Sequence, residues 1–480
     1  MKNYFLLLLP LLVLFGCEVE KGSPGSYYYD DYPCENRENY TDYGENPFVS
    51  VKEQPVSTFS IDADGGSYSN MRRFASAAQA PPEASVRIEE YLNYFNYDYP
   101  EPTNENVSVH TEITTCPWST GHYLLRIGMK GKSLETKKPS NFVFLIDVSG
   151  SMDSYDKIGI LKTGFKEFVD QLNENDRVAI VTYAGSAGVA LESTPGSEKS
   201  KIKAAINKLN AAGSTAGGAG ILTAYEIAKE NYIEGGNNRV VLGSDGDFNV
   251  GPSSTEELVE LIEEKRDDGI YLTVLGVGSG NLNDGMMEQL ANNGNGNYEY
   301  IDNLEQLKKV FVYEYDKFYT VAKDCKIQVE FNSESVDSYR LIGYENRVMN
   351  NEDFENDSTD AGEIGASQSV TALYQLVPTE NINAPFGTIH FRYSFPDDSQ
   401  VRQRNHTMQN VVISFDQASE STRFAASVAG FGMLMKKSEY SGNLTKENII
   451  QWASDAKSYD PYGFKDEFVQ LIGYINEDTY

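Results

Sequence analysis

The chain has 480 residues, enough for two or three domains with a substantial core. Its formal net charge of −31 would repel a phosphate backbone, which argues against a nucleic-acid-binding role. The four histidines lack the spacing of metal ligands, which argues against a zinc protease or a histidine-based hydrolase.

The N-terminus has the basic start and leucine-rich centre of a secretory signal. The apolar run, 5–14, is too short for a comfortable membrane span, and no later stretch is long and apolar enough. It ends at Leu14-Phe-Gly-Cys17, which resembles a bacterial lipobox with Cys17 as the lipidated first residue. The alternative is an ordinary cleaved signal with an incidental cysteine. We expect a bacterial cell-envelope protein at the outer membrane, facing the periplasm or the outside and touching the membrane only through its lipid.

Three more cysteines, Cys34, Cys116 and Cys325, leave an odd number in an oxidising compartment. Cys116 and Cys325 flank the central region, so a bridge is feasible if the ends of that region lie close together. Independent buried thiols are the preferred interpretation.

Residues 18–46 are rich in Gly, Ser, Tyr and acidic residues and predict a flexible tether. From 51 to 100 the pattern predicts a short strand and two helices. Asp62-Ala-Asp64-Gly65 is similar to the start of a calcium loop, but Arg73 stands where the closing acid of an EF-hand is needed. We therefore interpret it as a turn with acidic residues near a helix start.

Alternating apolar and polar residues at 107–113 and 123–129 predict antiparallel strands. Similar patterns return only after the central region, at 326–331, 339–344, 369–377, 388–395 and 410–415. The two groups plausibly form one β-sandwich into which the central region is inserted. The acidic segment 350–363 is interpreted as a solvated loop, with a second cation site as the alternative.

Strand and helix patterns alternate through the central region. Strands are expected at 142–146, 177–183, 238–243, 271–277 and 298–301, with helices between them and a last helix at 304–318. Such alternation implies a mostly parallel, doubly wound sheet, whose ligands collect at the carboxyl ends of the strands. Three helices, near 424–436, 444–456 and 465–474, end the chain.

The segment 141–152, NFVFLIDVSGSM, places oxygen-bearing side chains directly after a buried strand. Asp147, Ser149 and Ser151 supply one carboxylate and two hydroxyls, which suit a hard divalent cation and leave it receptive to another anionic ligand. The alternative is a polar turn in which the serines cap the next helix.

Two further loops complete an all-oxygen set. Thr215 lies in a glycine-rich loop, and Asp245 follows the strand 240–243. With Asp147, Ser149 and Ser151 they fit an octahedral Mg²⁺, with Mn²⁺ or Ca²⁺ as alternatives, and leave one position open.

This order, DxSxS, a Gly-flanked Thr and an Asp after a buried strand, resembles the metal-ion-dependent adhesion site of von Willebrand factor type A (VWA) domains. Segments 57–64, 88–100 and 426–444 extend the likeness to bacterial lipoproteins with a VWA domain between characteristic flanking regions. The resemblance implies a metal that accepts an Asp or Glu carboxylate from a protein partner. It also places 304–318 where related domains shift a terminal helix on ligand binding.

The expected fold class is α/β: a doubly wound sheet inserted in or flanked by a β-sandwich, with a small N-terminal α/β segment and a C-terminal helical region. The expected segments are a signal (1–17), a tether (18–50), an N-terminal VWA-associated region (51–105), sandwich strands (106–140), a VWA domain (141–320), a β-sandwich (321–418) and a helical region (419–480).

The favoured function is non-enzymatic, metal-dependent protein binding. One alternative is a metal-dependent envelope hydrolase, although Ser149 stands where such enzymes often carry a second acid. The other alternative is a structural envelope protein that a metal stabilises.

Overall fold

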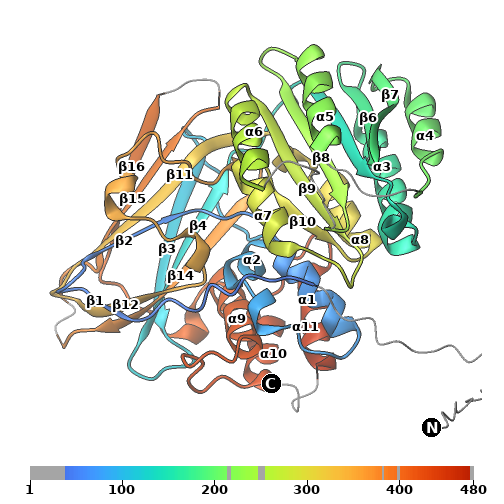
Figure 1. The fold of residues 1–480 in the computed structure, drawn as a ribbon. Coiled ribbons are helices and arrows are strands. Elements are labelled where there is room, and N and C mark those ends of the chain that lie inside the picture. Colours follow the sequence, from blue (N-terminus) through green and yellow to red (C-terminus); the bar gives the residue numbers. More distant parts are fainter. Residues whose placement is uncertain (1–37, 213–217, 247–254, 381–382, 397–399, 476–480) are drawn as a thin grey trace, which may run out of the picture. The chain divides into compact units, whose positions relative to one another are not determined.

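The computed structural model describes residues 38–212, 218–246, 255–380, 383–396 and 400–475 (Figure 1). The predicted lipidation site Cys17, the cysteine Cys34 and the predicted metal ligand Thr215 lie outside these residues. The segment boundaries expected from the sequence stay predictions.

A six-stranded sheet forms the central region. Its strand order is β10 (Tyr298–Ile301), β9 (Ile270–Val277), β8 (Asn237–Ser244), β5 (Ser140–Asp147), β6 (Arg177–Ala184) and β7 (Ser186–Pro195). All neighbours are parallel except β7, which runs antiparallel to β6. Every residue of β5 is buried, as expected for a central strand covered on both faces.

Helices cover both faces of this sheet. They are α3 (Ile160–Gln171), α4 (Lys199–Asn207), α5 (Gly218–Glu230), α6 (Thr255–Asp267), α7 (Asp284–Asn293) and α8 (Leu304–Lys308). Phe142 and Phe144 share an apolar cluster with residues of α3 and α8, whereas Val143 and Leu145 share another with α5, α6 and α7. Because successive side chains of a strand point to opposite faces, this division confirms the doubly wound arrangement.

The prediction of one continuous helix over 304–318 is wrong. After α8 the chain forms a π-helical turn, Lys309–Tyr313, and a 3₁₀ turn, Tyr315–Phe318. The Glu314 N–H donates to the Lys309 carbonyl, and the Lys309 ammonium binds the Glu314 carboxylate. In an α-helix two residues five apart would point about 140° away from each other. The wider π turn brings these two buried charges onto one side.

Strands from both sides of the central region pair in two further sheets. One has the order β1 (Val49–Ser50), β12 (Val336–Ile342), β14 (Ser369–Pro378), β4 (Tyr123–Gly131) and β3 (Val107–Thr115). The other has β13 (Ile364–Gly365), β11 (Thr320–Phe331), β15 (Gly387–Ser394) and β16 (Val401–Met408), with β2 (Val56–Ser60) also paired to β11. Residues of both sheets share one apolar cluster, so the expected sandwich and fold class are confirmed.

The strand predicted at 410–415 is wrong as well. This segment makes only an isolated bridge from Ile413 to Thr114, and the strand that pairs with β15 is β16. The polar segment Val401–Met408 escaped prediction because an edge strand has a neighbour on one side only and carries exposed polar residues.

The N-terminal and C-terminal helices lie together in Figure 1, far apart in sequence but in contact. They are α1 (Gly66–Ser76), α2 (Ile88–Asn93), α9 (Glu420–Met435), α10 (Lys446–Ser454) and α11 (Phe464–Tyr474), and they share one aromatic-rich cluster. In the described ranges, no helix combines the length and apolar character needed for a membrane crossing. Cys116 and Cys325 are free and buried, which confirms independent thiols.

Candidate functional site

Two predicted metal ligands come together at the carboxyl edge of the central sheet. Asp147 is the last residue of β5, and Asp245 follows the last residue of β8. The two strands are parallel neighbours, with Ile146 opposite Gly243, so the chain delivers both carboxylates to the same edge. Both side chains are buried.

The loop after β5 wraps around the Asp147 carboxylate. The Ser149 N–H donates to Asp147 Oδ1 over 2.8 Å, and the Ser244 hydroxyl donates to Oδ2 over 3.3 Å. The hydroxyls of Ser149 and Ser151 lie 3.0 Å apart. The capping alternative is wrong for Ser149, because it stands before the 3₁₀ turn Gly150–Met152 without a side-chain capping bond.

A lysine that was not predicted binds the second carboxylate. Lys157 Nζ lies 2.9 Å from Asp245 Oδ2 and donates to Asn281 Oδ1 over 3.1 Å. Lys157 belongs to the π-helical turn Tyr155–Gly159 that follows the serine loop. Lys157, six residues after Ser151, belongs to no recognised motif, and Asn281 is more than a hundred residues away in the sequence.

The two carboxylates differ in electrostatic environment. Burial raises the pKa of Asp147, and the nearby Asp245 raises it further against the hydrogen bonds from Ser149 and Ser244. Burial also acts to raise the pKa of Asp245, but hydrogen bonds from Asn281 and Lys157 outweigh it and lower that pKa. Within the described ranges, no Lys or Arg lies within ion-pair distance of Asp147.

This arrangement fits a divalent metal. Asp147 is a buried carboxylate that has no basic partner among the residues described, and two serine hydroxyls lie beside it. Oxygen donors of this kind suit Mg²⁺, Mn²⁺ or Ca²⁺ better than softer metals. The structure thus brings together Asp147, Ser149, Ser151 and Asp245, while Thr215 lies outside the described residues.

A second buried carboxylate cluster lies where α7 meets the N-terminal helices, and we call it the arginine network. Arg87 binds Asp284 and Glu90 and lies 3.5 Å from Glu288 Oε2. Arg347 Nη2 lies 2.9 Å from Asp62 Oδ2. One oxygen each of Asp62, Glu90 and Glu288 lies within 4.8 Å of the others.

The segment 62–65, which is similar to the start of a calcium loop, contributes Asp62 to the arginine network. Asp62 binds Arg347, and Arg73, the residue that excluded an EF-hand, pairs with Glu38 over 2.9 Å. Guanidinium groups therefore occupy the neighbourhood in which the three carboxylate oxygens gather. Sequence reasoning missed this network because Arg87 and Asp284 are 197 residues apart.

Comparisons with known proteins agree with this architecture. Residues 141–312 match the von Willebrand factor type A domain, residues 34–126 match the von Willebrand factor family vWF_A, and residues 316–385 and 379–477 match the C-terminal family of the protein YfbK. "Uncharacterized protein YfbK" of Escherichia coli (strain K12) is 38% identical over 465 residues, which cover 90% of this chain and 80% of YfbK.

Two further similarities concern more distant proteins. A UPF0353 protein of Mycolicibacterium vanbaalenii is 29% identical over 213 residues, which cover 38% of this chain and 63% of that protein. The solved structure of a von Willebrand factor type A protein from Catenulispora acidiphila is 14% identical, with a TM-score of 0.44, and covers 78% of this chain and 91% of that one. The names of these relatives specify no enzymatic activity.

Proposed function

This chain belongs to the YfbK family of VWA-domain proteins, and from this premise we propose that it is a non-enzymatic, metal-ion-dependent protein-binding module of the bacterial cell envelope. In this proposal Asp147, Ser149, Ser151, Thr215 and Asp245 hold Mg²⁺, with Mn²⁺ or Ca²⁺ as alternatives. The open position accepts an Asp or Glu carboxylate of a protein partner. A lipid on Cys17 anchors the chain to the outer membrane, facing the periplasm or the outside.

One observation carries the proposal: the Asp147 carboxylate is buried at a strand end beside two hydroxyls, and among the described residues it has hydrogen bonds but no cationic partner. An ionised carboxylate in such a place is costly without a positive partner. Ser151 is exposed beside it, so a ligand from solvent can reach this point.

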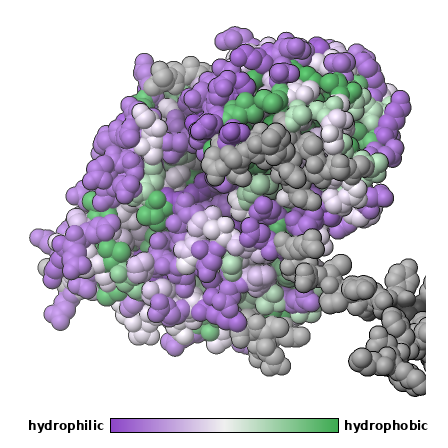
Figure 2. Space-filling model, viewed as in Figure 1, coloured by the Kyte–Doolittle hydropathy of each residue, from purple (hydrophilic) through white to green (hydrophobic). Residues whose placement is uncertain are grey.

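The charge balance favours an acidic group as the partner's contact. Lys157 already neutralises Asp245, so a divalent ion bound here would keep part of its charge after binding Asp147. The two serines add oxygen atoms but no charge. The chain as a whole carries −31, and hydrophilic residues cover most of the face seen in Figure 2. The bound metal would therefore supply the local attraction for a carboxylate that the rest of the surface repels.

An exposed aromatic side chain stands beside the site. Tyr155 is 73% exposed, four residues after Ser151, at the start of the turn that carries Lys157. A large exposed aromatic group next to a binding site is a suitable contact for a protein partner, since tyrosine is enriched among residues that dominate interface energies. We assign Tyr155 to the rim of the partner interface.

The test uses the full chain as bait for an envelope extract in Mg²⁺ or in excess chelator. The wild-type chain should retain a partner in Mg²⁺ and lose it in chelator, and Asp147→Ala should retain none in either. Asp156→Ala is the matched control, because Asp156 is an exposed acid of the same loop that accepts only from Ser154 in the described contacts. Capture that persists in chelator, or that Asp147→Ala preserves, contradicts the proposal.

A further inference from the structure

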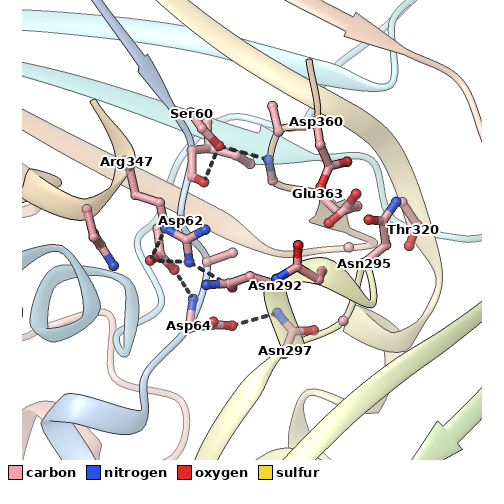
Figure 3. Close-up of a pocket in the computed structure, with 18 of the residues that line it drawn as sticks. Ser60, Asp62, Asp64, Asn292, Asn295, Asn297, Thr320, Arg347, Asp360 and Glu363 are labelled. Atoms are coloured by element: carbon pink, nitrogen blue, oxygen red, sulfur yellow. Dashed lines mark hydrogen bonds and ion pairs between the residues drawn. The ribbon is translucent and has the colours of Figure 1, made fainter. Parts of the chain in front are cut away.

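A polar cavity of about 440 Å³ lies between the VWA sheet and the flanking sheets (Figure 3). Three segments far apart in the sequence line it: 60–64 after β2, the asparagine-rich loop 292–297 between α7 and β10, and the segment 346–363 before β13. The two acidic motifs of the sequence, Asp62-Ala-Asp64 and 350–363, therefore meet at one place.

The lining is acidic and rich in oxygen acceptors. Its carboxylates belong to Asp62, Asp64, Asp353, Asp360 and Glu363, and its cations to Arg239, Lys317 and Arg347. Five acids face three bases, and none of the lining residues is aromatic. An excess of carboxylates without an aromatic platform favours a small cation over a planar or sugar-like ligand.

Two acceptors on this lining have no hydrogen-bond donor within the described ranges. Asn295 is only 8% exposed, and its Oδ1 makes no hydrogen bond. Glu363 Oε1 is likewise buried without a hydrogen-bond partner. Figure 3 shows Glu363, Asn295 and Thr320 on the same side of the cavity. Buried acceptors are normally satisfied, so two orphans at one cavity wall point to a missing positive group.

The backbone presents Asn295 at this wall in an uncommon conformation. Asn295 has a φ of 47°, in the left-handed region. Asparagine tolerates this region better than most residues, because its short polar side chain can interact locally. Here the side-chain oxygen makes no such interaction, so the strained turn places the amide at the cavity with its acceptor unused.

The nearby arginines have other partners. Arg266 Nη1 lies 2.7 Å from Asp360 Oδ2, and Arg239 donates to Thr273 Oγ1 over 2.8 Å and to the Phe318 carbonyl over 3.2 Å. In the part of the chain that the structure describes, no base lies within 4.0 Å of Glu363.

Burial, together with the neighbouring carboxylates of Asp360 and Asp324, raises the pKa of Glu363 well above its usual range. The charges of Arg266 and Arg239 act to lower this pKa but do not outweigh burial, so the ionised form of Glu363 is only partly compensated.

We propose that this cavity is a Ca²⁺ site, with Glu363, Asp360 and the Asn295 amide oxygen as protein ligands. Ca²⁺ accepts carboxylates, amide oxygens and waters in a flexible shell of six to eight ligands, and the cavity has room for the waters. Mg²⁺ demands a tighter octahedron and is the less suitable ion. The arginine network is a poorer candidate, because Arg87 and Arg347 pair with its carboxylates. Of the two carboxylates proposed here, Asp360 pairs with Arg266, but Glu363 has no base within 4.0 Å among the described residues. Bound Ca²⁺ would join the acidic segment before β13 to the α7–β10 loop of the VWA domain.

The test measures Ca²⁺ binding by equilibrium dialysis on the full chain carrying Asp147→Ala, so that the metal at the Asp147 site cannot contribute. We expect this protein to bind one Ca²⁺ and to melt at a higher temperature in CaCl₂ than in EGTA. Adding Glu363→Gln should weaken binding at least tenfold and remove the thermal shift. Adding Glu355→Gln, an exposed acid of the same segment that pairs with Arg392, should change neither.

Folding is monitored separately by the melting temperature in EGTA, which Glu363→Gln should leave unchanged or raise because a neutral amide replaces a carboxyl group whose ionised form burial disfavours. If that variant does not fold, Asn295→Asp should bind Ca²⁺ more tightly, since it adds a charged ligand that tolerates the same backbone region. The proposal is overturned if the Asp147→Ala protein binds no Ca²⁺, or if Glu363→Gln or Asn295→Asp leaves the affinity unchanged. All these outcomes are independent of whether a partner binds at Asp147.

Discussion

Two regions of this chain bury carboxylates and neutralise them in different ways. In the arginine network, a single arginine, Arg87, contacts Asp284, Glu90 and Glu288, and Arg347 also lies 3.9 Å from Glu288 Oε1. At the carboxyl edge of the VWA sheet, Lys157 pairs with Asp245, and the described part of the chain places no base within ion-pair distance of Asp147. The first region carries its counter-charges in its own side chains, whereas the second has hydroxyls and an exposed approach at Ser151.

The difference shows how the same acidic residues can serve structure or binding. Buried arginines fix carboxylates in one geometry with bidentate bonds and make them part of the fold. A buried carboxylate that has only hydroxyl and backbone donors as partners keeps an uncompensated negative charge. A metal ion from solution can compensate this charge. Stability should therefore depend on the arginine network, and metal binding on the sheet edge.

The largest expected effect is that of Arg87→Leu on stability. It leaves Asp284, Glu90 and Glu288 buried without their shared cation, and breaking a buried ion pair typically costs about 3–5 kcal/mol. Urea unfolding measures the change. Arg404→Leu is the matched control, because the exposed Arg404–Glu105 pair should cost no more than about 1 kcal/mol. Equal losses of unfolding free energy in Arg87→Leu and Arg404→Leu would contradict the stabilising role assigned to the arginine network.

A pH-dependent effect is expected next to the arginine network. Burial, with Glu345 and Asp62 nearby, raises the pKa of Glu89 to about 8, against about 4.5 for an ordinary Glu. The folded chain then holds one more proton than the unfolded chain between these pKa values. This contribution to stability is complete below pH 4.5 and is lost as the pH rises through about 8, by at most about 1.4 kcal/mol per pH unit.

Unfolding in urea at pH 5, 6, 7 and 8 measures the contribution. The wild-type chain should lose more stability over this range than Glu89→Gln, whose amide keeps an acceptor for the Tyr344 N–H. Glu53→Gln, at an exposed acid, should follow the wild type. Parallel curves for wild type and Glu89→Gln would refute the assignment.

At the sheet edge, Lys157→Met should strengthen Mg²⁺ binding by up to about tenfold. The substitution removes a positive charge that both competes for Asp245 and repels an incoming cation. Calorimetric titration measures the affinity. Lys162→Met should have no effect, because Lys162 donates to the carbonyls of Asn207 and Leu209 instead. Weaker binding by Lys157→Met would mean that the lysine supports the metal site.

The smallest effect on stability is expected for Tyr155→Ala, within about 0.5 kcal/mol, because the side chain is 73% exposed. Partner capture in Mg²⁺ should nevertheless fall several-fold if Tyr155 lies at the interface rim. Quantifying captured partner at equal bait load tests this. Unchanged capture would remove Tyr155 from the interface.

Local patterns predicted the central sheet and the carboxylates at its edge. The buried run before Asp147 and the apolar run before Asp245 identify parallel strands, and parallel strands bring their carboxyl ends to one edge. The patterns also predicted that sandwich strands would come from both sides of the VWA region. These features depend on residues adjacent in sequence.

Features that depend on distant contacts were not predicted. The π turn after α8 follows from the pairing of Lys309 with Glu314 in a buried environment, whereas the local sequence favours a helix. Arg87 finds its partners on α7, and Lys157 finds Asn281, without any motif that links them. Charge pairs between residues so far apart in the sequence depend on the fold, and no local sequence pattern indicates them.

Calorimetric titration of MgCl₂ into the full chain tests the central claim most directly. The wild-type chain should bind Mg²⁺ saturably at the sheet edge, Asp147→Ala should lose this binding, and Asp156→Ala should retain it. Equal Mg²⁺ binding by the wild type and Asp147→Ala, or none by the wild type, would contradict the claim that Asp147 holds a metal for a partner's carboxylate.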